Sequence, residues 1–335
     1  MSETKSIDLA LQGGGAHGAF TWGVLDRFLE DDRIRIEAIS GTSAGAMNAV
    51  VVADGLDRGG REGAIKALRT FWRGVSDAGA FSPMQRTFFD RMFGRWTLDW
   101  SPGYIMADLM TRLVSPYQMN PLDVNPVRMI VTKLIDFEHV RDATGIKIFV
   151  AATNVRTGKL KIFNRGEMTA DMVLASACLP YMFQAVEIDG EAYWDGGFMG
   201  NPSLVPLVEE CESRDIVIVQ INPVQRDTIP RTAHDILNRV NEITFNASLM
   251  KDIRYVAQLI KHFKNAGPDN ELRGELLFHR VNADEELKSL GVSSKFNTEW
   301  AFMEHLHDVG HRITSSWLDA NYHSLGNHST LDVDS

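Results

Sequence analysis

The first 60 residues alternate between short apolar runs and segments in which apolar positions follow helical spacing. Residues 7–12 and 34–40 have the composition of buried strands, and a helical pattern follows each of them, at 19–30 and 46–56. A glycine-containing loop connects each strand to its helix. Strand–helix units at this spacing predict a parallel sheet with helices on both faces.

The same alternation returns after residue 128. Further strands are predicted at 128–135, 145–154, 160–164, 185–189, 191–195, 215–223 and 276–281, and helices at 168–179, 232–264 and about 296–320. Turns at 156–159 and at Gly190 should join neighbouring strands into hairpins. In the helix at 232–264, Leu237, Val240 and Ile243 begin an apolar stripe. The polar tail from His323 is expected to be loose.

Residues 57–127 have a different texture. Gly and Pro interrupt short helical pieces, and strand signals are few, so we expect an inserted helical cap over the site. Nine aromatic residues fall within 71–104, and four arginines are interleaved with them: Phe71, Trp72, Phe81, Phe88, Phe89, Phe93, Trp96, Trp100 and Tyr104, with Arg73, Arg86, Arg91 and Arg95. Two interpretations stay open: a lid and lipid-contact surface, or the core of a small helical subdomain.

Charge and composition disfavour several classes of function. The net charge of −10 argues against a nucleic-acid partner, because binding a phosphate backbone requires a basic surface. Cys178 and Cys211 are the only cysteines and lack metal-ligand spacing, so neither a metal site nor a disulfide framework is expected. No apolar run reaches the roughly 18 residues that span a membrane. The start MSETKS lacks a basic stretch, so the cytoplasm is the expected location.

The sequence GTSAG at 41–45 lies between the strand 34–40 and the helix that follows it. It matches the G-x-S-x-G nucleophile elbow, a sharp strand-to-helix turn that exposes a serine hydroxyl. Gly41 and Gly45 remove side chains that would collide in such a turn. Ser43 is therefore the candidate nucleophile.

The loop GGGAHG at 13–18 allows two interpretations. It contains the dinucleotide pattern G-x-G-x-x-G, but that site requires an acidic residue at the tip of the second strand, and Glu37 lies in its middle. The alternative is an oxyanion hole, because glycines before a helix can direct backbone N–H groups at one point. Its candidate donors are Gly13, Gly14, Gly15 and Ala16, with Gly18 supporting the turn. We favour the oxyanion hole.

A third loop, DGG at 195–197, ends the predicted strand 191–195. Asp195 would be a carboxylate with little steric cover, because Gly196 and Gly197 follow it. A carboxylate is a weak base, and a partly desolvated setting beside Tyr193 and Trp194 should raise its basicity.

In this order, GGGAHG, GTSAG and DGG resemble the patatin-like phospholipase family, which is related to the catalytic domain of cytosolic phospholipase A2. The resemblance covers about 7–222 and implies a three-layer α/β/α fold, a Ser–Asp dyad without a catalytic histidine, and hydrolysis of lipid acyl esters without metal or cofactor. It makes Ser43 the nucleophile, Asp195 the base and the glycine loop the oxyanion hole. The family often has Arg or Lys where this chain has His17, so the resemblance does not guarantee a positive charge there.

The resulting expectation is a catalytic α/β domain at 7–222 with the cap at 57–127, a mainly helical extension at 223–322 and a loose tail at 323–335. The expected partner is a lipid or acyl-ester substrate, with peripheral membrane contact through 71–104, whereas the oligomeric state stays open. Two alternatives remain. One is a non-catalytic acyl- or nucleotide-binding regulatory protein, and the other is a Ser-His-Asp α/β-hydrolase, for which an elbow at residue 43 comes early in the chain.

Overall fold

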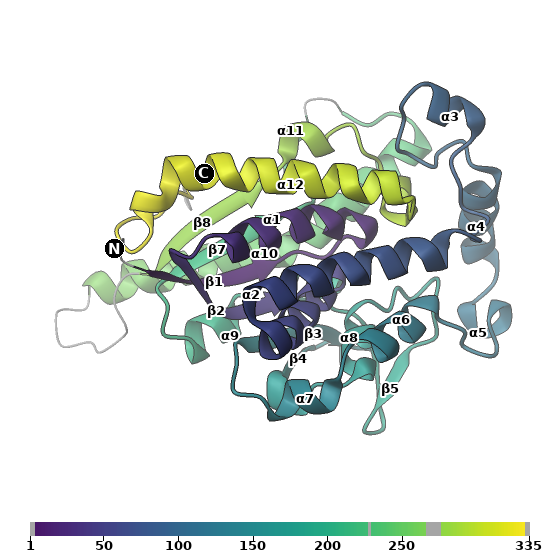
Figure 1. The fold of residues 1–335 in the computed structure, drawn as a ribbon. Helices are drawn as coiled ribbons and strands as arrows, with labels where there is room; N and C mark the ends of the chain where they lie inside the picture. Colours follow the sequence, from purple (N-terminus) through teal and green to yellow (C-terminus); the bar gives the residue numbers. More distant parts are fainter. Residues whose placement is uncertain (1–3, 227–228, 266–275, 332–335) are drawn as a thin grey trace.

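An eight-stranded sheet organises the computed structural model, which describes residues 4–226, 229–265 and 276–331 (Figure 1). Its strands are β1 (Lys5–Leu11), β2 (Ile34–Gly41), β3 (Lys147–Asn154), β4 (Leu160–Asn164), β5 (Val186–Ile188), β6 (Glu191–Asp195), β7 (Asp215–Gln220) and β8 (Leu277–Asn282). The order is β5-β6-β3-β2-β1-β7-β8, and β4 pairs with β3 outside this path. Strands β3, β2, β1, β7 and β8 run parallel, and β4, β5 and β6 add antiparallel pairs. The predicted mainly parallel sheet is confirmed.

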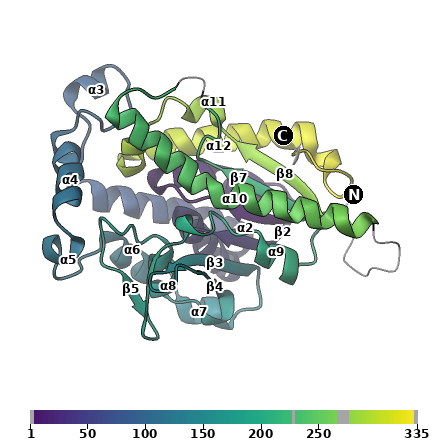
Figure 2. The ribbon, with the colours of Figure 1, turned by 180° about the vertical axis from the view of Figure 1, so that it is seen from behind.

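Helices cover both faces of this sheet and make three α/β/α layers. The front face in Figure 1 carries α1 (Gly18–Glu30), α2 (Ala44–Gly79) and α12 (Trp300–Asn321). The opposite face carries α9 (Val205–Glu210) and α10 (Ala233–Asn265), as Figure 2 shows. Among the described residues, no helix combines the length and apolarity needed to cross a membrane.

The core follows the two-residue period of the strands. In β1, Ile7, Leu9 and Leu11 join the apolar cluster of α1, α2 and α12, whereas Ala10 joins the cluster under α9 and α10. The second cluster also takes Leu249 and neighbouring residues from the second half of α10. Both faces of the central strands are covered, which is the reason that their sequences are mainly apolar; the buried Asp8 of β1 is an exception.

The inserted segment is helical, as predicted. After α2, which bends at Gly59 and Gly60, it contains α3 (Phe88–Met92), α4 (Pro102–Leu113) and α5 (Pro116–Met119); α6 (Pro126–Leu134) begins at its end, and α7 (Phe137–Asp142) follows. The expected boundary at residue 57 falls inside α2. In both views α3, α4 and α5 lie beyond the carboxyl ends of the parallel strands (Figures 1 and 2).

The predicted strand at 128–135 is wrong, because these residues belong to α6. Asn125 caps this helix through a bond from the Val127 N–H, and Pro126 occupies the first helical position. Ile130 and Val131 are its buried residues. A short apolar run fits a strand and a buried helix equally well, and here the Asn-Pro start decides for the helix.

The expectation of a loose tail is also wrong for the residues described. After α12, the short helix η5 (Tyr322–Ser324) leads into a segment that runs beside β8. Leu325 is fully buried, and Gly326 donates its N–H to the Asp215 carboxylate. Thr330 donates its N–H to the Phe278 carbonyl, so the segment adds hydrogen bonds to the sheet edge.

The helices α1 and α12 cross in direct backbone contact. A Cβ on Gly310 would fall inside van der Waals contact of the Phe20 carbonyl oxygen, and one on Gly23 would do so at the His307 carbonyl. The two glycines face each other's helix, so neither position has room for a methyl group.

Gly310→Ala is expected to lower the free energy of unfolding by about 1 kcal/mol. The clash with a backbone carbonyl costs about 1–3 kcal/mol, which outweighs the gain of up to about 1 kcal/mol from helix propensity. Denaturant unfolding checks this expectation. Gly166→Ala is the matched control, because a Cβ there has no atom within 4 Å. An unchanged midpoint for Gly310→Ala would contradict the close crossing.

Candidate active site

The elbow and the DGG loop meet because two strands share one edge of β3. β4 pairs with β3 along one edge, so β2 and β6 both occupy the other. Gly41, the last residue of β2, lies opposite Val150, and Asp195, the last residue of β6, lies opposite Ala152. These positions are two residues apart on β3, about 7 Å at the rise of a strand. The two strands therefore point their carboxyl ends at each other.

Ser43 has the strained backbone of a nucleophile elbow. Its φ and ψ are 54° and −120°, a region that side-chain-bearing residues rarely adopt. Tight contacts on both sides require glycine: a Cβ on Gly41 would lie 2.5 Å from the Gly45 carbonyl oxygen, and one on Gly45 would overlap the Leu11 carbonyl. This turn places Ser43 directly before the first residue of α2.

Asp195 is buried beside Ser43 with unused acceptor capacity. Its side chain is 1% exposed, and desolvation raises the pKa of the carboxyl to about 7, opposed by the Gly197 N–H, the Ser43 hydroxyl and the charge of Lys295. Oδ1 accepts the Gly197 N–H at 2.7 Å, whereas Oδ2 has no hydrogen bond of standard geometry within the described residues. The Ser43 hydroxyl is thus close enough to lower the pKa of Asp195, although its geometry does not meet that of a hydrogen bond. Such open geometry is common in unliganded catalytic pairs.

Residues 176–178, whose role no sequence pattern indicated, hold both partners. They start at the last residue of helix α8 (Ala170–Ser176), which is shorter than the helix predicted at 168–179. Ser176 accepts the Ser43 N–H at 2.9 Å, and the Cys178 carbonyl accepts the Asp195 N–H at 2.8 Å. These bonds fix the backbones on which the two reactive side chains stand.

The glycine loop packs directly against the elbow. A Cβ on Gly13 would lie 2.7 Å from both Ser43 Cβ and the Thr42 carbonyl oxygen. Gly15 has a positive φ of 59°, which favours glycine. The first two predicted strands therefore end side by side, and their loops form one surface at the carboxyl edge of the sheet.

The expected set of four oxyanion donors needs one correction. The Gly13 N–H already donates to Asn201 Oδ1 at 2.7 Å, so Gly13 serves the loop structure instead. The N–H groups of Gly14, Gly15 and Ala16 have no acceptor among the residues described. Three adjacent free donors before α1 form a site suited to an anion.

His17 does not carry a positive charge at neutral pH. Its side chain is 3% exposed, and Nε2 bonds Ser294 Oγ at 2.7 Å. Burial and the nearby charges of Lys295 and Arg226 lower the pKa of its imidazole to about 3. His17 therefore serves as a neutral packing and hydrogen-bonding group.

The C-terminal third, in which no motif was found, also contributes to the site. Asn201 Nδ2 donates to the Phe245 carbonyl on α10, and Asn246 accepts a bond from Gln12 Nε2. Lys295, on the short helix η4 (Val292–Phe296), donates to Asn222 Oδ1 at 2.6 Å. Single side chains of this kind have no sequence motif, so only their positions in space reveal them.

A cavity of about 600 Å³ lies between the cap and the DGG loop. On one side it is lined by residues 111–117 of the cap, and on the other by β3, Tyr181, Trp194 and Phe198. Trp194 and Phe198 flank the Asp195-Gly196-Gly197 turn in the sequence, but Ser43, Asp195 and the glycine loop are not among the residues that line the cavity. The mainly apolar lining suits an acyl chain.

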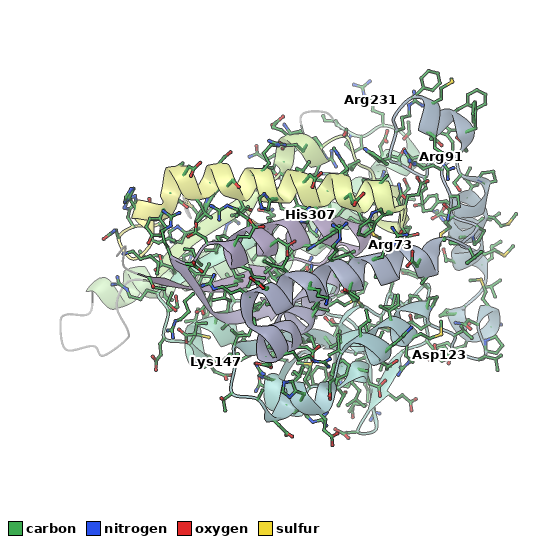
Figure 3. The ribbon with its side chains drawn as sticks, in the orientation of Figure 1. Arg73, Arg91, Asp123, Lys147, Arg231 and His307 are labelled. Atoms are coloured by element: carbon green, nitrogen blue, oxygen red, sulfur yellow. The ribbon has the colours of Figure 1, made fainter. Side chains whose placement is uncertain are left out.

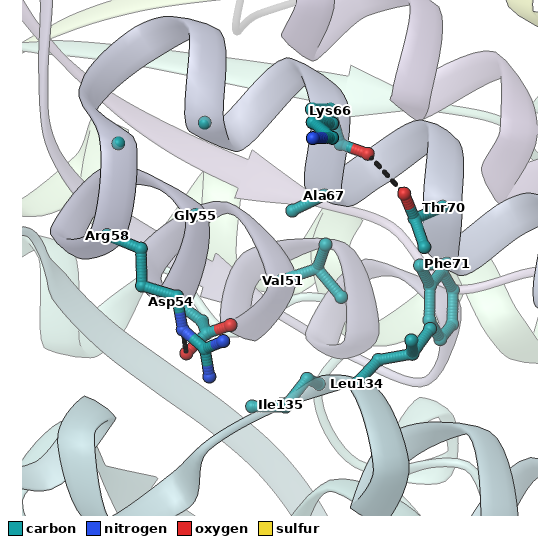
Figure 4. Close-up of a pocket in the computed structure, with 12 residues that line it drawn as sticks. Val51, Asp54, Gly55, Arg58, Lys66, Ala67, Thr70, Phe71, Leu134 and Ile135 are labelled. Atoms are coloured by element: carbon teal, nitrogen blue, oxygen red, sulfur yellow. Dashed lines mark hydrogen bonds and ion pairs between the residues drawn. The ribbon is translucent and has the colours of Figure 1, made fainter.

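A second cavity, of about 370 Å³, lies at the bend of α2 (Figure 4). Its lining includes Asp54, Arg58 and Phe71 from α2 and Leu134 at the end of α6. The Arg58 guanidinium pairs with the Asp54 carboxylate at 2.9 Å. No candidate catalytic residue lines this cavity either, and we place the chemistry at the carboxyl ends of the strands, where the elbow, the glycine loop and the DGG turn meet.

Within the part of the chain that the structure describes, one cluster has ligand atoms close enough to hold a metal ion: Asp8, Glu37 and Cys211, within 4.8 Å of one another. It lies at the amino-terminal half of β1 and β2, away from Ser43. Both oxygens of Glu37 already accept N–H groups, from Glu212 at 2.7 Å and Ser213 at 2.9 Å. Glu37 therefore holds the loop before β7, which also removes it as the acidic residue of a dinucleotide site.

The aromatic segment at 71–104 divides between core and surface. Phe71 and Trp72 are buried core residues of α2, and Trp96 packs between Phe302 and the Arg86 guanidinium. Tyr104 packs against the Phe296 ring at 6.0 Å, whereas the remaining aromatic side chains of the segment are exposed, several of them around α3, where Figure 3 labels Arg91. Across 81–129, the large apolar side chains that are at least half exposed are Phe81, Phe88, Phe89, Met92, Phe93, Trp100, Ile105, Met106, Leu113, Tyr117, Leu122, Val124 and Met129. We call this set the cap surface.

The first half of α10 extends this surface. Leu237, Val240 and Ile243, which begin the predicted apolar stripe, are 42%, 52% and 54% exposed. They lie beside the cap, because Gly291 approaches both Asn238 of α10 and Asp99 of the cap. Of the predicted stripe, Met250 and Ile253 in the second half of α10 pack against the core.

Known proteins resemble the chain in family and in structure. A family model for patatin-like phospholipases matches residues 9–208, and no curated protein matches the chain. The structure of VipD from Legionella pneumophila is 15% identical, with a TM-score of 0.37 over 92% of this chain and 67% of its own. The complex of ExoU with SpcU from Pseudomonas aeruginosa is 13% identical, with a TM-score of 0.31 over 93% of this chain. The chain spans 53% of that structure's chain.

Proposed function

Because the chain belongs to the patatin-like phospholipase family, we propose that it is a serine acyl-hydrolase with a Ser43–Asp195 dyad. The observation that supports this most is the buried Asp195 carboxylate with a free Oδ2 beside the strained Ser43. Lipid acyl hydrolysis in general follows from the family. The dyad, the oxyanion donors and the class of ester are our proposal.

In the proposed reaction Asp195 Oδ2 takes the proton of the Ser43 hydroxyl as Oγ bonds to the ester carbonyl carbon. The N–H groups of Gly14, Gly15 and Ala16 hold the negative oxygen of the tetrahedral intermediate. Its collapse breaks the carbon–oxygen bond to the alcohol, which leaves with the proton from Asp195. Water then attacks acyl-Ser43, giving its proton to Asp195, and the released acid leaves Ser43 with that proton restored.

A histidine-dependent triad finds less support. Among the histidines outside the glycine loop whose side chains are described, none hydrogen-bonds to Ser43 or Asp195. His279 bonds Asp215, His307 bonds Asp26 and His311 bonds Glu30. The side chains of His234 and His262 lie outside the described part. The geometry also agrees less well with a non-catalytic binding protein, because ligand binding alone would not require a strained backbone at Ser43.

The proposed substrate is a lipid ester taken from an aggregated phase. An exposed apolar surface of this extent is rare on a monomer and marks an interaction site. Arg91 and Arg95 border it at α3, where guanidinium groups can meet lipid phosphates while aromatic rings meet acyl chains. The cavity beside Trp194 and Phe198 would then receive one acyl chain. We propose a cytoplasmic enzyme that binds peripherally to lipid through the cap surface.

Ser43→Ala is expected to abolish turnover of p-nitrophenyl esters and labelling by a fluorophosphonate, because no other nucleophile stands at the elbow. Ser316→Ala, at an exposed position of α12, is the matched control and should behave as wild type. Circular dichroism verifies folding of both. Turnover retained by folded Ser43→Ala would refute the nucleophile, and an inactive, unlabelled wild type would favour the binding-protein alternative.

Asp195→Asn is expected to lower kcat/KM by about 10³-fold, because an amide cannot accept the serine proton. In wild type, kcat/KM should rise through about pH 7, since Asp195 must be ionised to act as base and burial raises its pKa to about 7. Each histidine outside the glycine loop, replaced by Ala, should change the rate less than tenfold. A histidine variant as inactive as Asp195→Asn would indicate a triad.

Trp100→Ala and Phe89→Ala are expected to lower turnover of phospholipid vesicles about tenfold, and turnover of a soluble short-chain ester less than twofold. Both side chains are about two-thirds exposed, so their removal should leave the core intact. Trp96→Ala is unsuitable for this test because Trp96 packs against Phe302. Tyr255→Ala, exposed on the second half of α10, is the control. Equal losses on both substrates, or none, would count against lipid contact.

A further inference from the structure

The C-terminal extension places a lysine inside the proposed hydrolytic site. The main chain of Lys295 covers the glycine loop so closely that a Cβ on Gly15 would lie 2.5 Å from its carbonyl oxygen. Its Nζ donates to Asn222 Oδ1 at 2.6 Å, and Asn222 Nδ2 donates to the Gly13 carbonyl at 2.9 Å. Lys295 thus contacts the glycine loop directly and through Asn222.

The same ammonium group also lies near the turn that carries Asp195. Nζ lies 5.6 Å from the centre of the Phe245 ring. That ring packs on Gly197, where a Cβ would overlap it, and Gly197 donates its N–H to Asp195. The charge of Lys295 accordingly lies between the oxyanion loop and the turn that carries the base.

Of the two carboxylates whose charges act on Lys295, only Asp195 has no ion pair with an arginine in the described part of the chain. Burial lowers the pKa of the Lys295 ammonium group to about 8, and among the nearby charges Glu242 and Asp195 oppose this shift whereas Arg226 adds to it. Glu242 is already paired with both Arg226 and Arg239. Buried His17 is neutral, so it neither supplies nor balances charge here. Lys295 and Asp195 remain as the unmatched pair.

We propose that Lys295 is the positioning cation of the hydrolytic site: held on Asn222, its ammonium group balances the single negative charge that the reaction moves from Asp195 to the oxyanion. This inference rests on the proposed dyad. It adds a residue from outside the segment that the family model matches. The physical basis is that a buried negative charge is costly unless an opposite charge lies near it.

Loss of the Lys295 charge should shift the pH profile of kcat/KM in one direction. The charge of Lys295 lowers the pKa of Asp195 against the effect of burial. Removing that charge raises this pKa, so the base stays protonated to higher pH and the acidic limb of kcat/KM moves upward. We expect a shift of roughly one pH unit, at the low end for a nearby opposite charge. A purely structural lysine would lower activity at all pH values without moving the limb.

The test measures kcat/KM against pH, together with the rate of fluorophosphonate labelling, for wild type, Lys295→Met and Lys295→Arg. Lys295→Met should shift the acidic limb upward in both assays, and Lys295→Arg should restore most of the wild-type position. Lys251→Met, at an exposed position on α10, should have no effect. If Lys295→Met does not fold, Lys295→Gln carries the same measurement with a polar chain of similar reach.

An unmoved limb in a folded, active Lys295→Met or Lys295→Gln would overturn the role of Lys295 and leave the dyad standing. Failure of the proposed function has a different pattern, because turnover would then survive Ser43→Ala or be lacking in wild type. If a Lys295 variant labels more slowly at every pH while the acidic limb of kcat/KM stays in its wild-type position, Lys295 is a structural residue only.

Discussion

The shared edge of β3 is the constraint on which the site depends. β2 ends there opposite Val150, and β6 approaches from the other direction and ends opposite Ala152. No intervening element separates the two chain ends, so the residues that follow β2 and those that end β6 must occupy the same small space. Serine and aspartate at these ends meet as a consequence of sheet register, although 152 residues separate them in the sequence.

The close packing around this point accounts for the glycines. Gly13 adjoins Ser43, Gly45 adjoins the end of β1, and Gly196 lies against the Ala151 carbonyl of β3. Each allows one backbone to touch another, which brings three loops within reach of a single carbonyl group. The cost of this arrangement is burial of a carboxylate, and the raised pKa of Asp195 expresses that cost. The same burial makes Asp195 a better base near neutral pH.

The sequence predicted the elements whose hydrophobic and turn patterns are local and match the final fold. Strand–loop–helix order located β1, β2 and both glycine-containing loops, and the turn at Gly190 indicated the β5–β6 hairpin. It failed at 128–135, where eight residues fit either structure until the Asn-Pro start is considered, and at the tail, whose hydrogen bonds to Phe278 are long-range. Ser176, Asn201 and Lys295 have no local pattern at all. Their roles arise from contacts across 133, 188 and 73 residues, which periodicity does not encode.

The limits of the family match and those of the site therefore differ. The match ends at residue 208, yet the cation that acts on the Asp195 carboxylate, Lys295, comes from η4. That element has three contacts in consecutive residues: Ser293 accepts the Leu98 N–H of the cap, Ser294 bonds His17, and Lys295 bonds Asn222. One short helix thus carries the cation and contacts both the apolar cap and the glycine loop. Because a five-residue 3₁₀ helix has little stability of its own, its position depends on these contacts, and the cap and the catalytic loops are mechanically connected through it.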